Sequence, residues 1–438
     1  MQVALISTYE LGRQPFGIAS PAAWLQRAGH EVICVDTSRQ RLPLEAVAQA
    51  GLIAFYLPMH TATRLALPLI EKMRDIRPKM HICCYGLYAP MNETLLREQG
   101  AQSIVGGEFE QALVDLAASI DPPLISLDRL HFIRPDRSQF PPLASYASLQ
   151  INGATRRAGS TEASRGCQYL CRHCPVVPVY NGAFRIVQRD VVLADIRQQV
   201  AMGAEHITFG DPDFFNGPTH AVAIVAGMHT EFPALTYDVT IKIEHLLKHR
   251  GLLAGLKDTG CLFITSAVES IDDRLLDLLD KGHTRADFLQ AVALTREAGL
   301  TLAPTFVTFT PWTTWSNYRE LLETIVALDL VENVAPIQLA IRLLIPAGSR
   351  LLELPEVREK IGPFDSAALS YRWRHDDPSL DRLCQEIQRL VQNEEKAGAA
   401  RRTIFAKIWE LAHDRPLLVD SHLTARATIP YLNEPWYC

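Results

Sequence analysis

Three cysteines lie close together in the segment ASRGCQYLCRHCP, residues 163–175. Cys167, Cys171 and Cys174 follow the spacing C-x3-C-x2-C. Four cysteines normally hold a four-iron cluster, so three cysteines leave one iron open to a small molecule. A structural zinc site that adds His173 is one alternative, but His173 and Cys174 are adjacent, whereas zinc ligands are normally separated by two or more residues. Buried thiols without a metal are a second alternative. The spacing favours a [4Fe-4S] cluster.

The composition is that of an ordinary globular protein of 438 residues. The formal net charge of −6 argues against a chain-wide basic surface for nucleic acid. No apolar run approaches the roughly 20 residues of a membrane-spanning helix, so we expect no membrane partner. The nine cysteines are odd in number and too few for a disulfide scaffold in a chain of this length. We therefore expect a reducing, cytoplasmic environment.

Residues 1–118 alternate short apolar runs with helical segments, which is typical of a doubly wound parallel sheet in an α/β protein. The expected strands are QVALIST, HEVICVD, GLIAFYLP, HICCYG and QSIVGG. Ligands of such sheets bind at the carboxyl ends of the strands. Residues 119–158 are rich in proline and lack periodicity, so we expect a linker over the surface.

A second alternation of strands and helices predicts a partial (βα)6 barrel of the TIM type over residues 159–350, because a full barrel has eight units. Its strands are expected at 159–164, 205–210, 235–241, 261–267, 302–309 and 336–342. The cysteine triad follows the first of these strands. It therefore lies at the carboxyl face, where the active sites of such barrels are found. Residues 351–438 are expected to form a mainly helical region.

The triad on this loop, followed by this barrel, resembles the radical S-adenosylmethionine (SAM) superfamily, whose signature is C-x3-C-x2-C. The resemblance covers residues 160–350. It implies that the open iron binds the amino and carboxylate groups of SAM. It also implies that the reduced cluster cleaves SAM to a 5′-deoxyadenosyl radical, which abstracts hydrogen from a substrate. A reductase, or a flavodoxin or ferredoxin, would then donate the electron.

The same resemblance suggests cofactor contacts beyond the triad. Gly210, Asp211 and Asp213 in FGDPDFF match the segment that meets the SAM amino group, although acids there could equally cap the next helix. In TIKIEHL, alternation places Lys242 and Glu244 on one face of a strand. A cofactor contact and a plain ion pair are both open for these two residues.

Three more residues and the histidine of the triad complete the expected cofactor contacts. Glu269 and Ser270, at the end of the fourth strand, match the unit that meets the ribose hydroxyls of SAM. Glu269 has no evident partner in the sequence. Arg342, in IRLLIPAGSRLL, could pair with the SAM carboxylate or with a neighbouring acid. His173 is placed with these residues because it lies within the triad.

A doubly wound domain before such a barrel resembles the cobalamin-binding class of the superfamily, in which the corrinoid lies between the two domains. The usual Asp-x-His-x-x-Gly signature is absent, and the corresponding loop, TYELGRQPFG, has no histidine. Two interpretations are open: cobalamin bound without a histidine ligand, or a domain that only buries the open side of the barrel. Tyr9 and His60 are candidate contacts, although polar residues at strand ends more often only solvate loops.

The last residues, ATIPYLNEPWYC, end at Cys438. Tyr431, Trp436 and Tyr437 carry much apolar surface, so we expect this segment to dock on the body of the protein. It is similar to the end of the CUAEP/CCAEP-tail radical SAM proteins, as is the early stretch ELGRQPFGIASPAAWL. Those tails continue with selenocysteine or Cys and then Ala-Glu-Pro. Our hypothesis is a truncated selenoprotein whose Cys438, a candidate catalytic residue, belongs to a Cys-selenocysteine pair that acts in redox chemistry or binds a soft metal or metalloid. An in-frame TGA after codon 438 would support it.

The sequence therefore predicts a radical SAM enzyme that acts on an unknown substrate. If cobalamin binds, methylation of an unactivated carbon is the expected reaction; otherwise hydrogen abstraction leads to rearrangement or bond formation. A non-catalytic iron–sulfur or zinc protein is the alternative. A sulfur-inserting RNA-modifying enzyme is a third option, but its N-terminal domain would carry a second cysteine trio. Here that domain has Cys34 and the adjacent pair Cys83 and Cys84.

Overall fold

The computed structural model describes residues 1–417 and 424–434. Its N-terminal domain holds a six-stranded sheet in the order β2-β1-β3-β4-β5-β6, and every pair in it is parallel. The order changes direction at β1 and β3, which makes a topological switch point. The predicted doubly wound sheet is thus confirmed. Its first five strands are β1 (Gln2–Ser7), β2 (Glu31–Asp36), β3 (Leu52–Tyr56), β4 (His81–Tyr85) and β5 (Ser103–Gly107).

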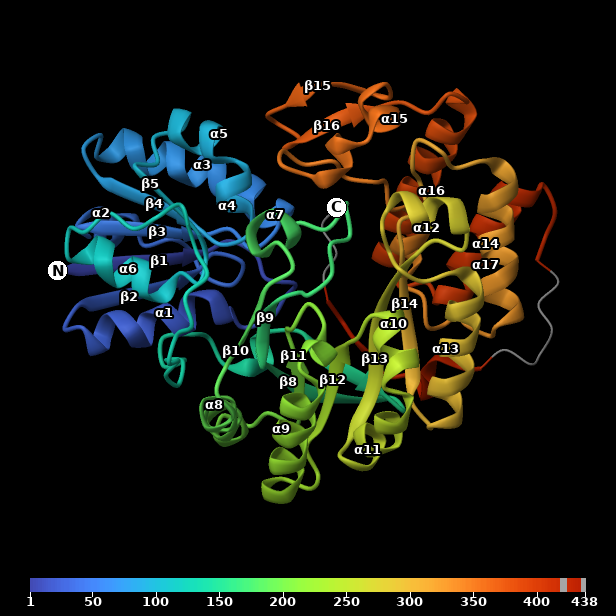
Figure 1. Cartoon of the computed structure of the whole chain (residues 1–438), viewed down its shortest axis with the longest axis horizontal. Helices are drawn as coiled ribbons and strands as arrows, with labels where there is room; N and C mark the ends of the chain where they lie inside the picture. The colour runs from blue at the N-terminus through green and yellow to red at the C-terminus, as the bar shows by residue number, and fades with distance from the viewer. Residues whose placement is uncertain (418–423, 435–438) are drawn as a thin grey trace.

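Helices cover both faces of this sheet (Figure 1). Because successive side chains of a strand point to opposite faces, Val3 and Leu5 pack on one side and Ala4 and Ile6 on the other. The first side is covered by α1 (Phe16–Arg27) and α6 (Glu110–Ala117). The second is covered by α2 (Leu44–Ala48), α3 (His60–Ile76), α4 (Tyr88–Met91) and α5 (Glu93–Glu98).

The segment 119–158 is more than the surface linker expected from its prolines. Arg137 is fully buried, and its guanidinium donates to Asp195 (Nε to Oδ1, 2.7 Å) and to Gln14 of the N-terminal domain (Nη1 to Oε1, 2.9 Å). These bonds fasten the segment between the two domains. It contains β6 (Ile125–Ser126), the 3-10 helix η1 (Leu143–Ser145), β7 (Ser148–Ile151) and the start of β8 (Ala154–Thr161).

The second sheet has the order β14-β13-β12-β11-β8-β7-β17, and β8 to β14 run parallel. With β8, the parallel strands are β11 (His206–Phe209), β12 (Thr236–Thr240), β13 (Cys261–Glu269) and β14 (Thr301–Phe306). The sixth predicted strand, 336–342, is wrong. Pro336–Ala340 forms the 3-10 helix η4, and a single parallel bridge from Phe309 to Arg342 stands in the sixth position. The partial barrel is confirmed with five full parallel strands.

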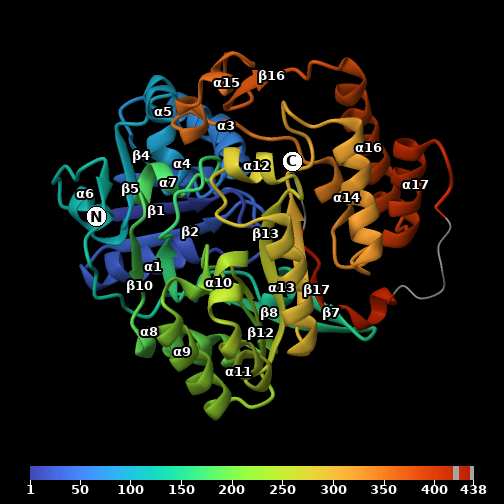
Figure 2. The same ribbon diagram turned by 45° about the vertical axis from the view of Figure 1, so that its right-hand side comes forward.

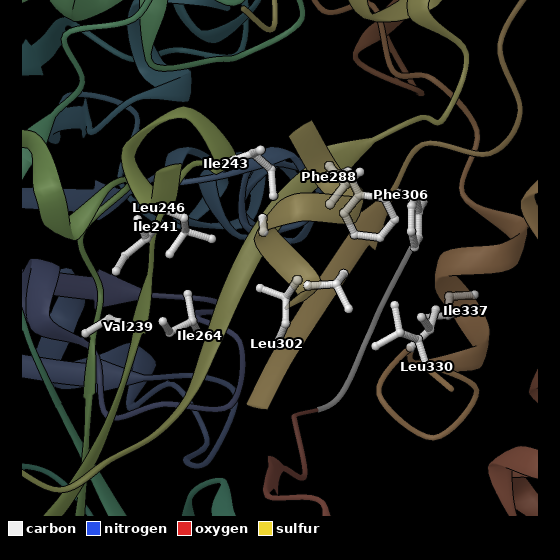
Figure 3. Packing of buried hydrophobic residues seen from close by; sticks show 14 of the residues in the cluster. Val239, Ile241, Ile243, Leu246, Ile264, Phe288, Leu302, Phe306, Leu330 and Ile337 are labelled. Carbon is white, nitrogen blue, oxygen red and sulfur yellow. The ribbon is translucent and has the colours of Figure 1, made fainter. Parts of the chain in front are cut away.

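Apolar side chains fill the space between this curled sheet and its outer helices (Figure 3). Val239, Ile264, Leu302 and Phe306 come from neighbouring strands and are almost fully buried. The helices that follow the strands are α8 (Arg189–Ala201), α9 (Pro218–Glu231), α10 (Ile243–Lys248), α11 (Leu253–Asp258), α12 (Asp273–Leu278), α13 (Arg285–Glu297) and α14 (Trp315–Ala327). This packing fixes the carboxyl ends of the strands, where the cysteine loop begins.

The C-terminal region is mainly helical, as predicted, with α16 (Pro378–Lys396) and α17 (Arg401–His413). It adds an antiparallel hairpin, β15 (Ile361–Asp365) and β16 (Ser370–Trp373). The strand β17 (Tyr431–Leu432) then pairs with β7 (Figure 2). Tyr431 therefore docks as expected, while Trp436, Tyr437 and Cys438 lie outside the described residues. Over the described parts of the chain, no helix has both the length and the apolar character needed to cross a membrane.

Candidate active site

The cysteine loop leaves the barrel after β8 and a short strand, β9 (Ser164–Gly166). Asp211 anchors the start of this loop, because its carboxylate accepts hydrogen bonds from the backbone N–H of Ala163 (2.9 Å) and from Ser164 Oγ (2.6 Å). Burial raises the pKa of the Asp211 carboxyl to about 7, and these hydrogen bonds oppose the rise. Asp211 therefore positions the loop and does not line the cavity that holds the three cysteines.

Cys167, Cys171 and Cys174 line one cavity of about 100 Å³, which we call the cysteine cavity. Burial raises the pKa of the Cys167 thiol to about 12 and that of Cys174 to about 11. These two thiols are therefore protonated at neutral pH without a metal, and metal binding must displace their protons. The other lining residues come from strand ends and the loops after them: Tyr169, His173, Pro212, Asp213, Thr240, Lys242, Ala267, Glu269 and Lys281.

The donor set fits an iron–sulfur cluster better than a structural zinc ion. Within residues 1–417 and 424–434, no three His, Cys, Asp or Glu side chains converge closely enough to hold one metal ion. A single zinc would draw all its ligands to roughly 2.0–2.3 Å from one point. His173, the alternative zinc ligand, instead contacts Glu269 through Nε2 at 3.1 Å. The three thiols are thus available to three separate irons of one cluster.

Glu269 is held beside the cysteines by Lys281 and His173. Its Oε1 lies 3.1 Å from His173 Nε2 and 3.5 Å from Lys281 Nζ. Burial alone would raise the pKa of this carboxyl, but Lys281 and His173 outweigh burial and lower the pKa to about 2. The backbone of Glu269 has φ = 66°, a left-handed conformation that non-glycine residues adopt mainly where function or packing requires it. The sequence-based expectation of a strand-end carboxylate at the site agrees with this placement.

Asp213 also lies at the cysteine cavity, and it caps a 3-10 helix as the alternative interpretation suggested. One carboxylate oxygen accepts from the backbone N–H of Phe215 (3.1 Å), and the other lies 2.7 Å from His245 Nδ1. His245 Nε2 in turn lies 2.6 Å from the amide nitrogen of Gln168 in the cysteine loop. This chain of contacts connects β11 with the loop and holds the Asp213 side chain in place.

Lys242 and Glu244 are not on a strand, so the alternation argument was wrong for them. The strand β12 ends at Thr240, Lys242 precedes α10, and Glu244 lies within α10. The two side chains form an ion pair, as the simpler interpretation allowed. The ammonium group of Lys242 also lies 3.6 Å from the ring centroid of Tyr169. Lys242 thereby reaches the wall of the cysteine cavity, whereas Glu244 does not line it.

Three other expected contacts lie away from the cysteine cavity. Gly210 lines two neighbouring cavities, where its missing side chain leaves room. Ser270 accepts a hydrogen bond from the backbone N–H of Asp272 (3.0 Å) and faces a separate small cavity. Arg342 pairs with Asp381 (2.6 Å) and lines a groove in the C-terminal region, so the neighbouring acid is its partner. Asp381 is 39 residues away in the sequence, too far to be identified by pattern.

A second cavity, of about 180 Å³, lies between the N-terminal sheet and the barrel, and we call it the interdomain cavity. Its wall includes the loops after β1, β3, β4 and β5 on one side and residues 160–166 on the other. Its described lining contains no histidine. His60 lies outside this lining and bonds to the carbonyl oxygen of Ala368 (2.6 Å). The Glu10 carboxyl faces the cavity, and burial raises its pKa to about 8.

Sequence inspection missed the residue that joins this interface to the cysteine loop. Arg165, two residues before Cys167, donates through Nη2 to Glu110 Oε1 (2.7 Å) and through Nε to Glu162 Oε2 (2.7 Å). A third carboxylate, from Glu108, lies 3.3 Å from Nη1. The only signal in the sequence was the position of an arginine next to the triad. Lys281 was also missed, although it lies in the segment DKGHT that follows α12.

Residues 161–325 match the family model of the Radical SAM superfamily. The chain carries a radical SAM domain. That domain contains the cysteine loop, every residue of the cysteine cavity and the strands β11 to β14. The predicted resemblance of the barrel is therefore confirmed. The resemblance of the tail to the CUAEP/CCAEP-tail proteins stays a prediction.

Relatives of the chain include two proteins named for methyl transfer. The chain is 25% identical over 218 residues to the bacteriochlorophyllide d C-12(1)-methyltransferase of Chlorobaculum tepidum, which covers 47% of this chain and 46% of that protein. It is 24% identical over 220 residues to the hopanoid C-3 methylase of Methylococcus capsulatus. That match covers 50% of this chain and 40% of the methylase. The matches thus span less than half the length of these relatives.

Solved structures show that the N-terminal domain and the radical SAM domain occur together elsewhere. The cobalamin-dependent radical enzyme OxsB, with aqua-cobalamin and SAM bound, matches with a TM-score of 0.69 and 14% identity over 90% of this chain and 67% of that one. TsrM from Kitasatospora setae, with cobalamin and a [4Fe-4S] cluster bound, matches with a TM-score of 0.58 and 17% identity. The match covers 75% of this chain and 70% of TsrM. At these identities the likeness establishes the shared fold.

Proposed function

We propose that Cys167, Cys171 and Cys174 bind a [4Fe-4S] cluster and that the chain is a radical SAM enzyme. The observation that carries this proposal is the convergence of the three thiols on one cavity at the carboxyl face of a partial barrel. When bound, the cluster supplies the electron that cleaves SAM and starts radical chemistry. The donor of that electron, a reductase or a flavodoxin or ferredoxin, and the cytoplasmic location remain part of the proposal.

The side chains around the cysteine cavity suggest how SAM is held. Glu269 keeps its negative charge well below neutral pH and is the strongest candidate for a cofactor contact. Lys281 and His173 hold its carboxylate in place from two sides. Asp213, in the loop after β11, is fixed by His245. These fixed carboxylates can accept hydrogen bonds from hydroxyl or ammonium groups of SAM without reorganising.

SAM cleavage tests the proposed function. Protein reconstituted anaerobically with iron and sulfide should contain about four irons per chain. After reduction with dithionite it should convert SAM to 5′-deoxyadenosine, which chromatography with mass detection measures. A protein that binds its iron fully and forms no 5′-deoxyadenosine would support the non-catalytic alternative.

Cobalamin between the two domains is the second part of the proposal. The interdomain cavity lies at the carboxyl ends of the N-terminal strands, where ligands of doubly wound sheets bind. It adjoins a further cavity inside the barrel, with which it shares Leu11, Arg13, Gly210 and Pro212. The methylases among the relatives and the cobalamin in OxsB and TsrM favour methyl transfer to carbon as the reaction. The substrate is unknown.

Reconstitution with hydroxocobalamin should leave corrinoid bound after gel filtration. We expect an absorption spectrum without a histidine ligand to cobalt, because the described lining of the interdomain cavity has no histidine. Leu87→Trp places a larger side chain at this cavity and should sharply reduce retention. Leu65→Trp, on the exposed surface of α3, is the matched control and should retain corrinoid. Loss of all corrinoid by the unmodified protein would favour a domain that only buries the barrel.

A further inference from the structure

The open side of the barrel is closed by the segment 424–434. At one end, the backbone N–H of Thr424 donates to Asp329, in the turn after α14 (3.0 Å). At the other end, β17 pairs with β7. The segment thus runs from the turn after α14 to the strand β7. A cavity of about 330 Å³, which we call the barrel cavity, lies between it and the strands β11 to β14.

Two arginines line the barrel cavity without a carboxylate partner. Arg401, at the start of α17, and Arg426, in the closing segment, both donate to the backbone carbonyl of Glu332. Both guanidinium groups also lie over the ring of Tyr431, with their carbons 5.3 and 3.3 Å from its centroid. Within the described parts of the chain, neither forms an ion pair, and Nη2 of Arg426 is buried without a hydrogen-bond partner.

The nearby acids Glu332 and Glu395 offset the charge of Arg401 only in part, because they raise its pKa less than burial and Arg426 lower it. The Glu332 carboxylate is almost fully buried and lies 3.8 Å from a third guanidinium, that of Arg402. Burial, together with repulsion from Arg426, lowers the pKa of Arg401 to about 9. Two partly buried cations that share one carbonyl are costly unless an anion joins them. An oxyanion would accept hydrogen bonds from the free N–H donors of both guanidinium groups.

The acids elsewhere in the barrel cavity already have partners. Asp238 accepts from Thr208 (2.6 Å) and contacts His206 (2.9 Å). Glu434 is paired with Arg13, whose Nε lies 3.0 Å from Glu434 Oε1. An added anion would therefore collect at the arginine end. The lining also includes the apolar side chains of Phe209, Phe263, Ile429, Pro430 and Leu432.

The barrel cavity also adjoins the cysteine cavity, because Pro212 and Thr240 line both. A molecule anchored at Arg401 and Arg426 can therefore extend toward the three cysteines. We propose that the barrel cavity is the substrate site and that it takes a small organic acid, whose carboxylate or phosphate group lies between Arg401 and Arg426. This inference rests on the proposed radical SAM function and adds the substrate class to it.

Calorimetry on the full chain with its cluster tests this proposal. The probes are 3-phenylpropionate, phenyl phosphate and the neutral 3-phenylpropionamide, which share an apolar ring. At least one acid should bind about tenfold more tightly than the amide, because charge-assisted hydrogen bonds form only with the acids. Tighter binding of 3-phenylpropionate would indicate a carboxylate site, and tighter binding of phenyl phosphate would indicate a phosphate site. Equal affinity for the amide and both acids, or no binding of either acid, would overturn the proposal.

Substitutions show which residues cause the preference for the acids over the amide. Arg401→Gln combined with Arg426→Gln should abolish the preference for acids, and Arg401→Gln alone, the milder change, should reduce it. Lys407→Gln removes one charge from the same helix at a half-exposed pair with Glu394, and it should keep the preference. An unchanged preference in the single and double arginine variants would overturn the assignment. SAM cleavage by the unmodified protein is measured separately, so failure of acid binding with normal cleavage counts against this inference alone.

Discussion

Replacing Cys171 with alanine is expected to reduce bound iron from about four atoms per chain to less than about one, and 5′-deoxyadenosine formation should disappear with it. The reason is that the cysteine cavity offers three thiols, and two cannot hold a cubane whose remaining ligand is SAM. Iron assays and product analysis on the same preparation measure both effects. Cys167→Ala and Cys174→Ala should behave alike.

Cys261→Ala is the matched control for this loss. Cys261 is a fully buried thiol at the start of β13, in the same barrel, but outside the cysteine cavity. Its removal should leave the iron content unchanged and cost about 1 kcal/mol of stability. Retention of four irons by Cys171→Ala, or one zinc per chain with no iron uptake by the unmodified protein, would contradict the assignment of the triad.

Replacing Arg165 with methionine is expected to lower the free energy of unfolding by about 3–5 kcal/mol, because breaking a buried ion pair leaves uncompensated charge. The Arg165 side chain is 7% exposed and faces the carboxylates of Glu108, Glu110 and Glu162. Burial already raises the pKa of Glu108 to about 7, and Arg165 opposes that rise. Urea unfolding of the metal-free protein measures the loss.

A surface arginine controls for the effect of removing any guanidinium. Arg157 lies on β8, is about half exposed and contacts Glu205 at 3.4 Å. Arg157→Met should change the unfolding free energy by less than about 1 kcal/mol. Arg165→Lys keeps the charge but loses the paired hydrogen bonds of the guanidinium group. Its loss of unfolding free energy should therefore lie between those of Arg165→Met and Arg157→Met. Equal losses for Arg165→Met and Arg157→Met would show that the buried network does not join the domains as described.

Local sequence was sufficient for the parts of the fold and site that depend on spacing. The C-x3-C-x2-C spacing resembles the signature of the radical SAM superfamily, and apolar runs such as LIAFY correspond to buried parallel strands. Glu269 could be anticipated because strand ends of a barrel face its active site. In each case the relevant residues lie within one short segment.

The errors arose where distant parts of the chain decide the structure. The run Ile241–Lys242–Ile243–Glu244 alternates like a strand, but short apolar runs do not distinguish strand from helix, and α10 begins at Ile243. The predicted sixth strand begins at Pro336, and residues 336–340 coil into η4, where Gln338 accepts a hydrogen bond from the backbone N–H of Phe306 (3.1 Å).

The partners of two site residues were equally hidden in the sequence. Lys281 reaches Glu269 across 12 residues and a helix, and Glu110 reaches Arg165 across 55 residues. No periodic pattern connects such pairs, because only the packing of the two domains and the closure of the barrel bring them together. The barrel cavity was missed for the same reason, since Arg401 and Arg426 lie on elements that follow the radical SAM domain.

Three cysteines should leave one iron of the cluster open to SAM. The electron paramagnetic resonance spectrum of the dithionite-reduced protein, recorded before and after addition of SAM, tests it most directly. We expect a [4Fe-4S] signal whose g values shift when SAM is added, because SAM becomes a ligand of the open iron. A spectrum that stays unchanged at saturating SAM, in protein with four irons per chain, would contradict the claim.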